Sequence, residues 1–238
     1  MSDQPERKSS ILDEIIQRGN IASDTVALSP NLKHQGVYIL HGADDDNVPA
    51  TQAQLMAKTL KEFHHDWQYH EEPGKDHWWT NEYKDGGSAC LDWPEMYDMF
   101  ARHALPPVNA IREVEFVTAN PGVSSKCHWL SIDAQIMQHK LSRVKVMTFP
   151  NGSRFVGTTD NVRILRLETS HLRNDGPLQV QLDGQELKDI PAPENRGPLW
   201  LKKDNDQWAV TPRPGPQLKG PYRYGAMKSE LKHKFMFV

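Results

Sequence analysis

Residues 37–71 carry a strand–helix–strand pattern, and this pattern constrains the fold of the first half of the chain more than any other feature. The apolar run V-Y-I-L at 37–40 predicts a buried strand. Thr51 is a suitable N-cap for a helix over about residues 51–63, and the alternating segment W-Q-Y-H-E at 67–71 predicts a second strand. A right-handed crossover of this length makes the two strands parallel, so the loops that follow them lie at one edge of the sheet.

Two side chains suited to acid–base chemistry lie in those loops. The first strand is followed by A-D-D-D-N-V, which includes Asp45, and the second by P-G-K-D-H-W-W, which includes His77. An Asp that accepts a hydrogen bond from one imidazole nitrogen fixes the tautomer, and the other nitrogen is then left to take a proton from a hydroxyl. The pattern therefore favours Asp45 and His77 as the acid and base of a Ser-His-Asp triad.

The stretch from about Ala22 to Leu105 resembles the C-terminal end of the catalytic domain of the prolyl oligopeptidase family of serine peptidases. The family pattern H-G-x-x-D-D-x-V is matched by H-G-A-D-D-D-N-V, and its G-x-x-H loop is matched by G-K-D-H. The resemblance implies an α/β-hydrolase fold in which Asp45 and His77 are catalytic and Asn47 helps to hold the carbonyl group of a peptide or related acyl substrate. Trp78, beside the catalytic loop, is a candidate for lining the substrate pocket, although an aromatic residue at such a position is more often part of the core.

The sequence departs from the family in its nucleophile. It contains no G-x-S-x-G motif, and the chain order Ser, Asp, His of these hydrolases places the missing Ser upstream. Ser88, in G-G-S-A-C, is the Ser nearest to the triad loop in sequence, but its context favours an ordinary loop. We therefore expect a piece of a larger protein, or a truncated product, that is inactive as an isolated chain.

The acidic triplet at 44–46 and the histidines allow other interpretations. Three consecutive Asp residues also suit a solvated turn or a site for a hard cation, but the spacing of an EF-hand is absent. His64, His65, His70 and His77 do not show the spacing of a zinc motif, so they are expected to face solvent near the helix end. We predict no metal and no cofactor.

Composition excludes several classes of partner. With 28 Lys and Arg against 31 Asp and Glu, the net charge is −3, and there is no basic excess for nucleic acid or an anionic membrane surface. No apolar segment approaches the length of a membrane span. Cys90 and Cys127 are expected to be free thiols rather than a disulfide. The sequence indicates no compartment.

The second half of the chain changes to a periodicity of two. A helix that begins near Asp92, which is a suitable N-cap, ends before L-P-P at 105–107, because a helix cannot continue through that pair of prolines. Short alternating segments follow, separated by turn signals such as N-P-G and D-G, and they predict a β-sandwich. The expected strands are 114–118, 128–132, 144–149, 154–158, 162–167, 178–182, 199–202 and 207–210.

The expected organisation has three parts. Residues 1–107 form a partial α/β-hydrolase sheet, residues 108–211 form an all-β accessory domain, and residues 212–238 form a Pro-rich extended segment with a terminal strand. The β part resembles, more weakly, the module that follows the catalytic domain in some bacterial members of the family. The resemblance implies a serine-type peptidase completed by a missing N-terminal catalytic half, with a homo-oligomer also open. The alternative is a non-catalytic binding or assembly module, or one half of a split hydrolase.

Overall fold

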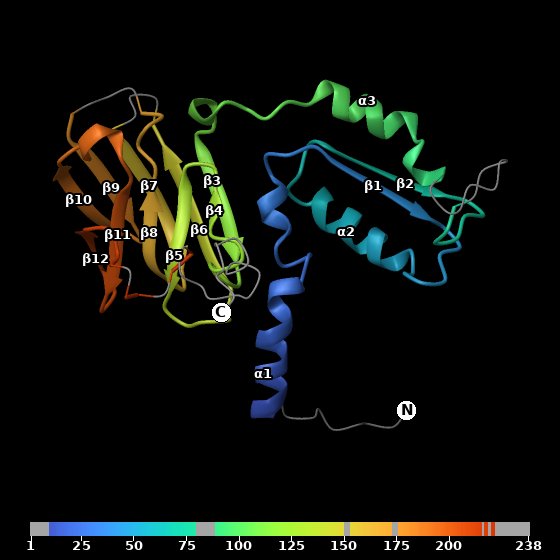
Figure 1. The fold of residues 1–238 in the computed structure, drawn as a ribbon, viewed down its shortest axis with the longest axis horizontal. Helices are drawn as coiled ribbons and strands as arrows, with labels where there is room; N and C mark the ends of the chain where they lie inside the picture. The colour runs from blue at the N-terminus through green and yellow to red at the C-terminus, as the bar shows by residue number, and fades with distance from the viewer. Residues whose placement is uncertain are drawn as a thin grey trace, which may run out of the picture. The chain divides into compact units, whose positions relative to one another are not determined.

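A computed structural model describes residues 10–79, 89–149, 153–172, 176–215, 217–218 and 220–221 (Figure 1). The described part forms two compact units. One is Thr25–Pro106, and the other combines the chain from Pro107 onward with the described residues up to Asp24. The break falls between Pro106 and Pro107, one residue before the expected boundary, and the described N-terminal residues group with the β unit instead of with the rest of 1–107. Ser88 and the expected terminal strand lie outside the described residues.

The first unit contains the expected strand, helix and strand, and the two strands pair in parallel from Val37↔Trp67 to Gly42↔Glu72. Figure 1 shows the second and third helices on opposite sides of this strand pair, as in a doubly wound sheet. The elements are η2 (Ser29–Leu32), β1 (Val37–Gly42), α2 (Thr51–Lys61), β2 (Trp67–Glu72), η3 (Ala89–Leu91) and α3 (Pro94–Arg102).

The expected helix caps are wrong in both places. The residue that precedes α2 is Ala50, so Thr51 lies inside the helix, and α3 begins after Trp93 rather than at a capping Asp92. Neither cap position makes a side-chain hydrogen bond. Pro94 in the first turn explains the start of α3, because its fixed φ suits the helix and its missing N–H needs no partner there.

Aromatic packing and one ion pair hold the ends of this unit together. The Trp93 indole N–H donates to the Tyr38 hydroxyl at 2.7 Å, and Trp79, only 6% exposed, packs edge-on against Trp93. His103, after α3, has Nδ1 at 2.5 Å from the Met99 carbonyl oxygen and Nε2 at 2.5 Å from an Asp66 carboxylate oxygen. Both acceptors need an N–H, so the geometry suits the doubly protonated imidazolium. These contacts, led by the Met99 carbonyl, raise the pKa of His103.

The second unit is built around two five-stranded sheets, which confirms the expected all-β part. The sheet orders are β10-β9-β7-β6-β3 and β12-β11-β8-β5-β4, and within them β7 and β9 pair in parallel. The strands are β3 (Glu113–Thr118), β4 (Lys126–Cys127), β5 (Leu130–Gln135), β6 (Ser142–Thr148), β7 (Arg154–Asp160), β8 (Val162–Leu167), β9 (Leu178–Leu182), β10 (Gln185–Ile190), β11 (Leu199–Asp204) and β12 (Gln207–Thr211). The helical elements of the unit are α1 (Ile11–Asn20), η1 (Ile21–Ser23), η4 (Val108–Ala110) and η5 (Glu194–Arg196).

The core of this unit consists of the inward-facing residues of both sheets. Phe116 and Phe155 are buried around Trp129, whose ring lies 5.7 Å from that of Phe155. The Trp129 indole N–H donates to the Ile111 carbonyl oxygen at 2.9 Å, so the one polar atom of this buried ring is satisfied. In β6 every second residue is buried, which is the two-residue period that predicted the strand.

A two-residue turn, Asp183-Gly184, joins β9 to β10. Both residues have positive φ, 51° and 86°, as a type I′ turn requires. The Asp183 carboxylate accepts hydrogen bonds from the Thr159 amide at 2.6 Å, the Trp208 indole at 2.9 Å and the Lys203 ammonium at 3.1 Å. Burial raises the pKa of Asp183, but the bonds from Trp208, Thr159 and Lys203 outweigh it and lower the pKa below its usual value.

No helix among the described residues has the length and apolar composition needed to cross a membrane. Cys90 and Cys127 are both free thiols. Burial raises the pKa of Cys127 to about 11, so this thiol stays protonated near neutral pH and is a poor nucleophile.

We predict that Asp183→Ala lowers the free energy of unfolding of the β unit by about 1–3 kcal/mol, because the Trp208 and Thr159 donors lose their acceptor. The same variant should lose less stability on acidification, since a carboxylate with a lowered pKa stabilises the fold above its unfolded pKa and loses that effect as pH falls. Urea unfolding at several pH values measures both. Asp206→Ala, at another Asp with positive φ (60°) and a side chain that is 93% exposed, is the matched control. It carries the same backbone cost of an alanine in the left-handed region and should lower stability by about 1 kcal/mol or less.

A second prediction concerns His103. Its raised pKa means that its stabilising effect is fully present below about pH 6.5, the unfolded value, and is lost as pH rises through the folded pKa. Unfolding of the chain, followed by the fluorescence of the first unit's tryptophans, should therefore show a loss of stability on the alkaline side that His103→Gln removes. An unchanged pH dependence in His103→Gln would show that another group causes it.

Candidate active site

The parallel pairing of β1 and β2 places the two predicted loops side by side at the carboxyl ends of the strands. Beyond the strands, the Ala43 amide donates to the Glu72 carbonyl oxygen and the Asp44 amide to that of Lys75, both at 2.9 Å. Gly42 lies so close to the second loop that a Cβ there would be 2.4 Å from the Lys75 carbonyl oxygen and 2.6 Å from that of Asp76. Only glycine allows this approach without displacement of the backbone.

Asp45 is the centre of the arrangement. Its Oδ1 accepts the backbone amides of Asn47 at 2.9 Å and Val48 at 2.7 Å. Its Oδ2 lies 3.1 Å from His77 Nδ1 and 3.3 Å from His41 Nε2. The side chain is only 6% exposed. The structure therefore brings Asp45 and His77 into direct contact.

The protonation of the pair follows from these contacts. Burial raises the pKa of Asp45, but the hydrogen bonds from Val48, His77 and Asn47 outweigh it and lower the pKa below its usual value. An ionised carboxylate can only accept, so His77 Nδ1 must carry the proton of their shared bond. In the neutral imidazole Nε2 then has a free lone pair, which is the form that a general base needs.

The two tryptophans that follow His77 differ in their exposure to solvent. Trp78 is 66% exposed and its ring lies edge-on to the imidazole, with centroids 5.0 Å apart, so it can contact a substrate beside His77. Trp79 is in the core instead. Asn47 is exposed on the same loop as Asp45, with its backbone amide bonded to that carboxylate. Its backbone is therefore held beside the pair, and the residue is open to solvent.

Among the other histidines that were expected to face solvent, His65 is exposed, whereas His64 and His70 have structural partners. His64 is only 5% exposed, so the expectation that it faces solvent is wrong: its Nε2–H donates to the Leu32 carbonyl oxygen at 2.8 Å, and its Nδ1 accepts the Asp66 amide at 3.0 Å. His70 contacts the Glu72 carboxylate at 2.6 Å. Within the described residues no group of three or more His, Cys, Asp or Glu side chains is arranged to hold a metal ion.

His41 is the member of the site that sequence reasoning missed. In the sequence it marks only the end of a strand, although it is the first residue of the H-G-x-x-D-D-x-V pattern. The alternation of side chains along the strand could have predicted which face of the sheet His41 lies on. Its contacts with Asp45 and Val48 depend on the conformation of the loop that follows, which the sequence does not indicate.

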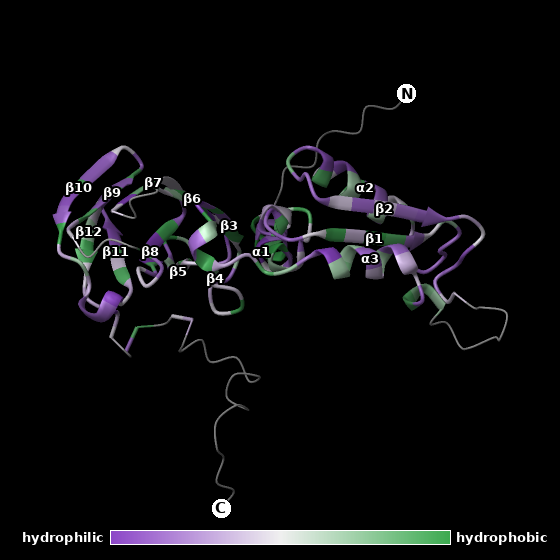
Figure 2. Cartoon of the chain, turned by 90° about the horizontal axis from the view of Figure 1, so that it is seen from above, coloured by the Kyte–Doolittle hydropathy of each residue, from purple (hydrophilic) through white to green (hydrophobic). Residues whose placement is uncertain are grey.

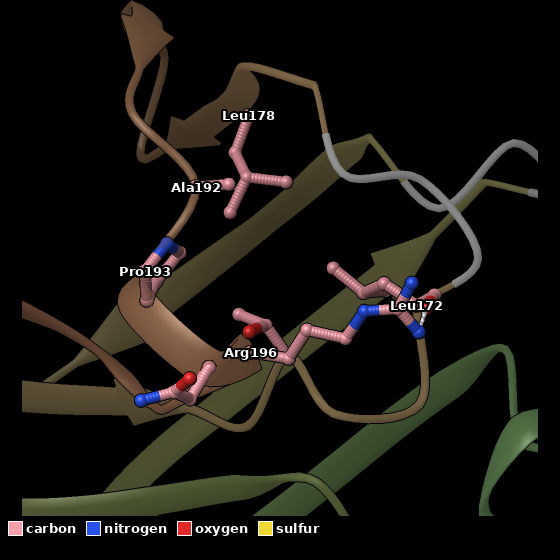
Figure 3. A pocket seen from close by; sticks show the side chains of 7 residues that line it. Leu172, Leu178, Ala192, Pro193 and Arg196 are labelled. Carbon is pink, nitrogen blue, oxygen red and sulfur yellow. Dashed lines mark hydrogen bonds between the residues drawn. The ribbon is translucent and has the colours of Figure 1, made fainter.

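A pocket of about 370 Å³ lies in the β unit (Figure 3). Its lining is mixed: Leu172, Leu178 and Pro193 are apolar, whereas Asn195 and Arg196 are polar. Arg196 donates to the Leu172 carbonyl oxygen at 3.4 Å. No pattern in the sequence predicted it. Among the described residues, the contact between His77 and Asp45 is the arrangement suited to acid–base chemistry.

Comparisons with known proteins do not identify a family. No family model matches the chain, and no solved structure matches it. A relative is an uncharacterized secreted protein of Arthroderma benhamiae, 28% identical over 177 residues, which are 71% of this chain and 17% of the relative. The chain thus spans less than a fifth of the length of that relative.

We predict that Gly42→Ala disrupts the Asp45–His77 hydrogen bond, because the new methyl group would overlap two backbone carbonyl oxygens of the second loop. Long-range ¹H–¹⁵N NMR of His77 measures the result: the parent should show a protonated Nδ1, and the variant should show a mixture of tautomers. Gly19→Ala is the matched control, since a Cβ at that position would have open space around it. An unchanged His77 spectrum in folded Gly42→Ala would contradict the role given to this close approach.

Proposed function

We propose that this chain supplies the acid and base of a serine-type hydrolase of the prolyl oligopeptidase family, acting on peptide or related acyl bonds. The observation that carries the proposal is the contact between His77 Nδ1 and the buried carboxylate of Asp45 at the carboxyl edge of two parallel strands. Loops at this edge are where catalytic groups gather in open α/β sheets.

In the proposed reaction His77 Nε2 takes the proton of a serine hydroxyl as that oxygen attacks the substrate carbonyl carbon. His77 then gives the proton to the leaving group, and the cycle repeats with water. Asp45 stays ionised, holds the tautomer and stabilises the imidazolium. Asn47 and Trp78 lie at the substrate side. The serine itself comes from a polypeptide segment outside this chain.

The edge of β1 that is unpaired within the described residues supports the proposal that a segment outside this chain supplies the serine. Figure 2 shows β1 as an apolar strand beside the polar β2. Among the described residues, β1 pairs with β2 alone, and Val37–Leu40 are only half-buried although they are apolar or aromatic. A parallel strand of this composition is normally covered and paired on both sides. A further strand at this edge would bring its own loop to the Asp45–His77 pair.

A second function, binding or assembly without catalysis, is favoured by α1. Four aliphatic residues of this helix are exposed, from Ile16 at 52% to Ile11 at 78%. Exposed apolar side chains that gather in this way mark sites of interaction with another protein. Under this alternative the Asp45–His77 pair is a remnant of hydrolase ancestry or belongs to one half of a split enzyme.

A fluorophosphonate probe tests the proposal. The isolated chain should not be labelled, and labelling and ester hydrolysis should appear when it is mixed with an upstream family fragment that carries G-x-S-x-G. His77→Ala should then lower turnover of the mixture by roughly 10⁴- to 10⁶-fold. His65→Ala, at an exposed residue outside the site, is the control and should leave turnover unchanged.

Two results would count against the proposal. Covalent labelling of the isolated chain would mean that it has its own nucleophile. Hydrolysis by the mixture that survives His77→Ala would mean that the fragment acts alone and that the pair has no part in catalysis.

A further inference from the structure

His41 contacts two residues of the loop that follows β1, Asp45 and Val48. It lies near the end of β1, and its side chain is 15% exposed. Its Nε2 is 2.8 Å from the Val48 carbonyl oxygen and 3.3 Å from Asp45 Oδ2. The same nitrogen therefore contacts the residue that closes the loop and the carboxylate that the loop holds.

The chemistry of these neighbours fixes the proton. A carbonyl oxygen can only accept, so the 2.8 Å contact with Val48 requires a proton on His41 Nε2. The same protonated nitrogen lies 3.3 Å from Asp45 Oδ2, so the carboxylate oxygen is a second acceptor within reach of the group that is bonded to Val48. An oxygen of a carboxylate has room for two hydrogen bonds, so Oδ2 can accept from His41 and His77 at once.

A second carboxylate lies close to the ring. His41 is paired in the strand register with Glu71, whose pKa is lowered first by the Tyr69 hydroxyl, then by the Gln54 amide, and also by the charge of His41. The Gln54 amide is 2.9 Å from Glu71. His41 thus has two ionised carboxylates as neighbours, Asp45 and Glu71.

We infer that His41 is a positioning residue, which shares Asp45 Oδ2 with His77 and holds the carboxylate in the orientation that His77 needs. Asp45 then accepts two amides on Oδ1 and has two imidazoles at Oδ2: His77, which is hydrogen-bonded at 3.1 Å, and His41, whose Nε2 is in ion-pair contact at 3.3 Å. The carboxylate cannot rotate about its Cβ–Cγ bond without losing several of these bonds. The catalytic meaning of this role rests on the proposed function, but the positioning itself does not.

A merely structural role for His41 makes a different prediction. If its bond to Val48 only closed the loop, its removal would lower stability without a specific effect on the carboxylate. If it shares Oδ2, its removal takes away a donor to the charged form of Asp45 and raises the pKa of that group.

Two substitutions separate these roles. His41→Gln can keep an N–H donor near the position of Nε2, whereas His41→Leu has similar bulk and no donor. NMR titration of the Asp45 side-chain carbon should show a midpoint raised by about 0.5–1 pH unit in His41→Leu and close to the parent in His41→Gln. In the same samples His77 should lose its single Nδ1–H tautomer in His41→Leu and retain it in His41→Gln. Thermal unfolding reports whether each variant is folded.

The parent chain provides a test that does not depend on a folded variant. Long-range ¹H–¹⁵N NMR of His41 should show the proton on Nε2 at neutral pH, and a bare Nε2 would overturn the inference. So would a folded His41→Leu in which both the Asp45 titration and the His77 tautomer are unchanged. These measurements use the isolated chain and no substrate, so failure of the mixed hydrolysis assay would remove the proposed function and leave the role of His41 in place.

Discussion

The parallel pairing of β1 with β2 is the constraint on which the candidate site depends. Six residue pairs in register bring both strands to an end at the same level, and two further backbone hydrogen bonds continue the approach into the loops. Asp45 and His77 are 32 positions apart in sequence, and only this pairing makes them neighbours. The absence of a side chain at Gly42 is a second condition, because the second loop passes directly over that position.

A strand pair of this kind has limited stability by itself, so the helices matter. Leu60 of α2 and Met99 of α3 are buried on the two helices, and Trp93 links α3 to Tyr38 of β1. The β unit, in contrast, has one large buried core shared by two sheets. The chain therefore combines a well-packed β unit with a smaller unit whose apolar strand is only half-buried, and the candidate site is in the latter.

Elements with a clear hydrophobic period could be predicted from the sequence, and those without one could not. The eight expected strands of the second half are all present, but β4 has only two residues and β10, Q-E-L-K-D-I, is largely exposed, so neither gives a pattern to detect. The helix caps were wrong because Thr51 and Asp92 have capping chemistry without the required position. The burial of His64 depends on Leu32, far away in sequence, and no local signal indicates it.

The candidate site was likewise predictable only in part. Spacing and crossover rules predict that the loops of Asp45 and His77 meet, but they do not predict which of three consecutive Asp residues is buried. The structure distinguishes them: Asp44 and Asp46 are exposed, whereas the Asp45 side chain is 6% exposed and bonded at both oxygens. In a solvated turn the middle carboxylate would stay exposed, because burial alone raises the pKa of Asp45 and disfavours its charged form. Amide and imidazole donors on both oxygens offset that cost, and one of them leaves His77 with the lone pair of a general base.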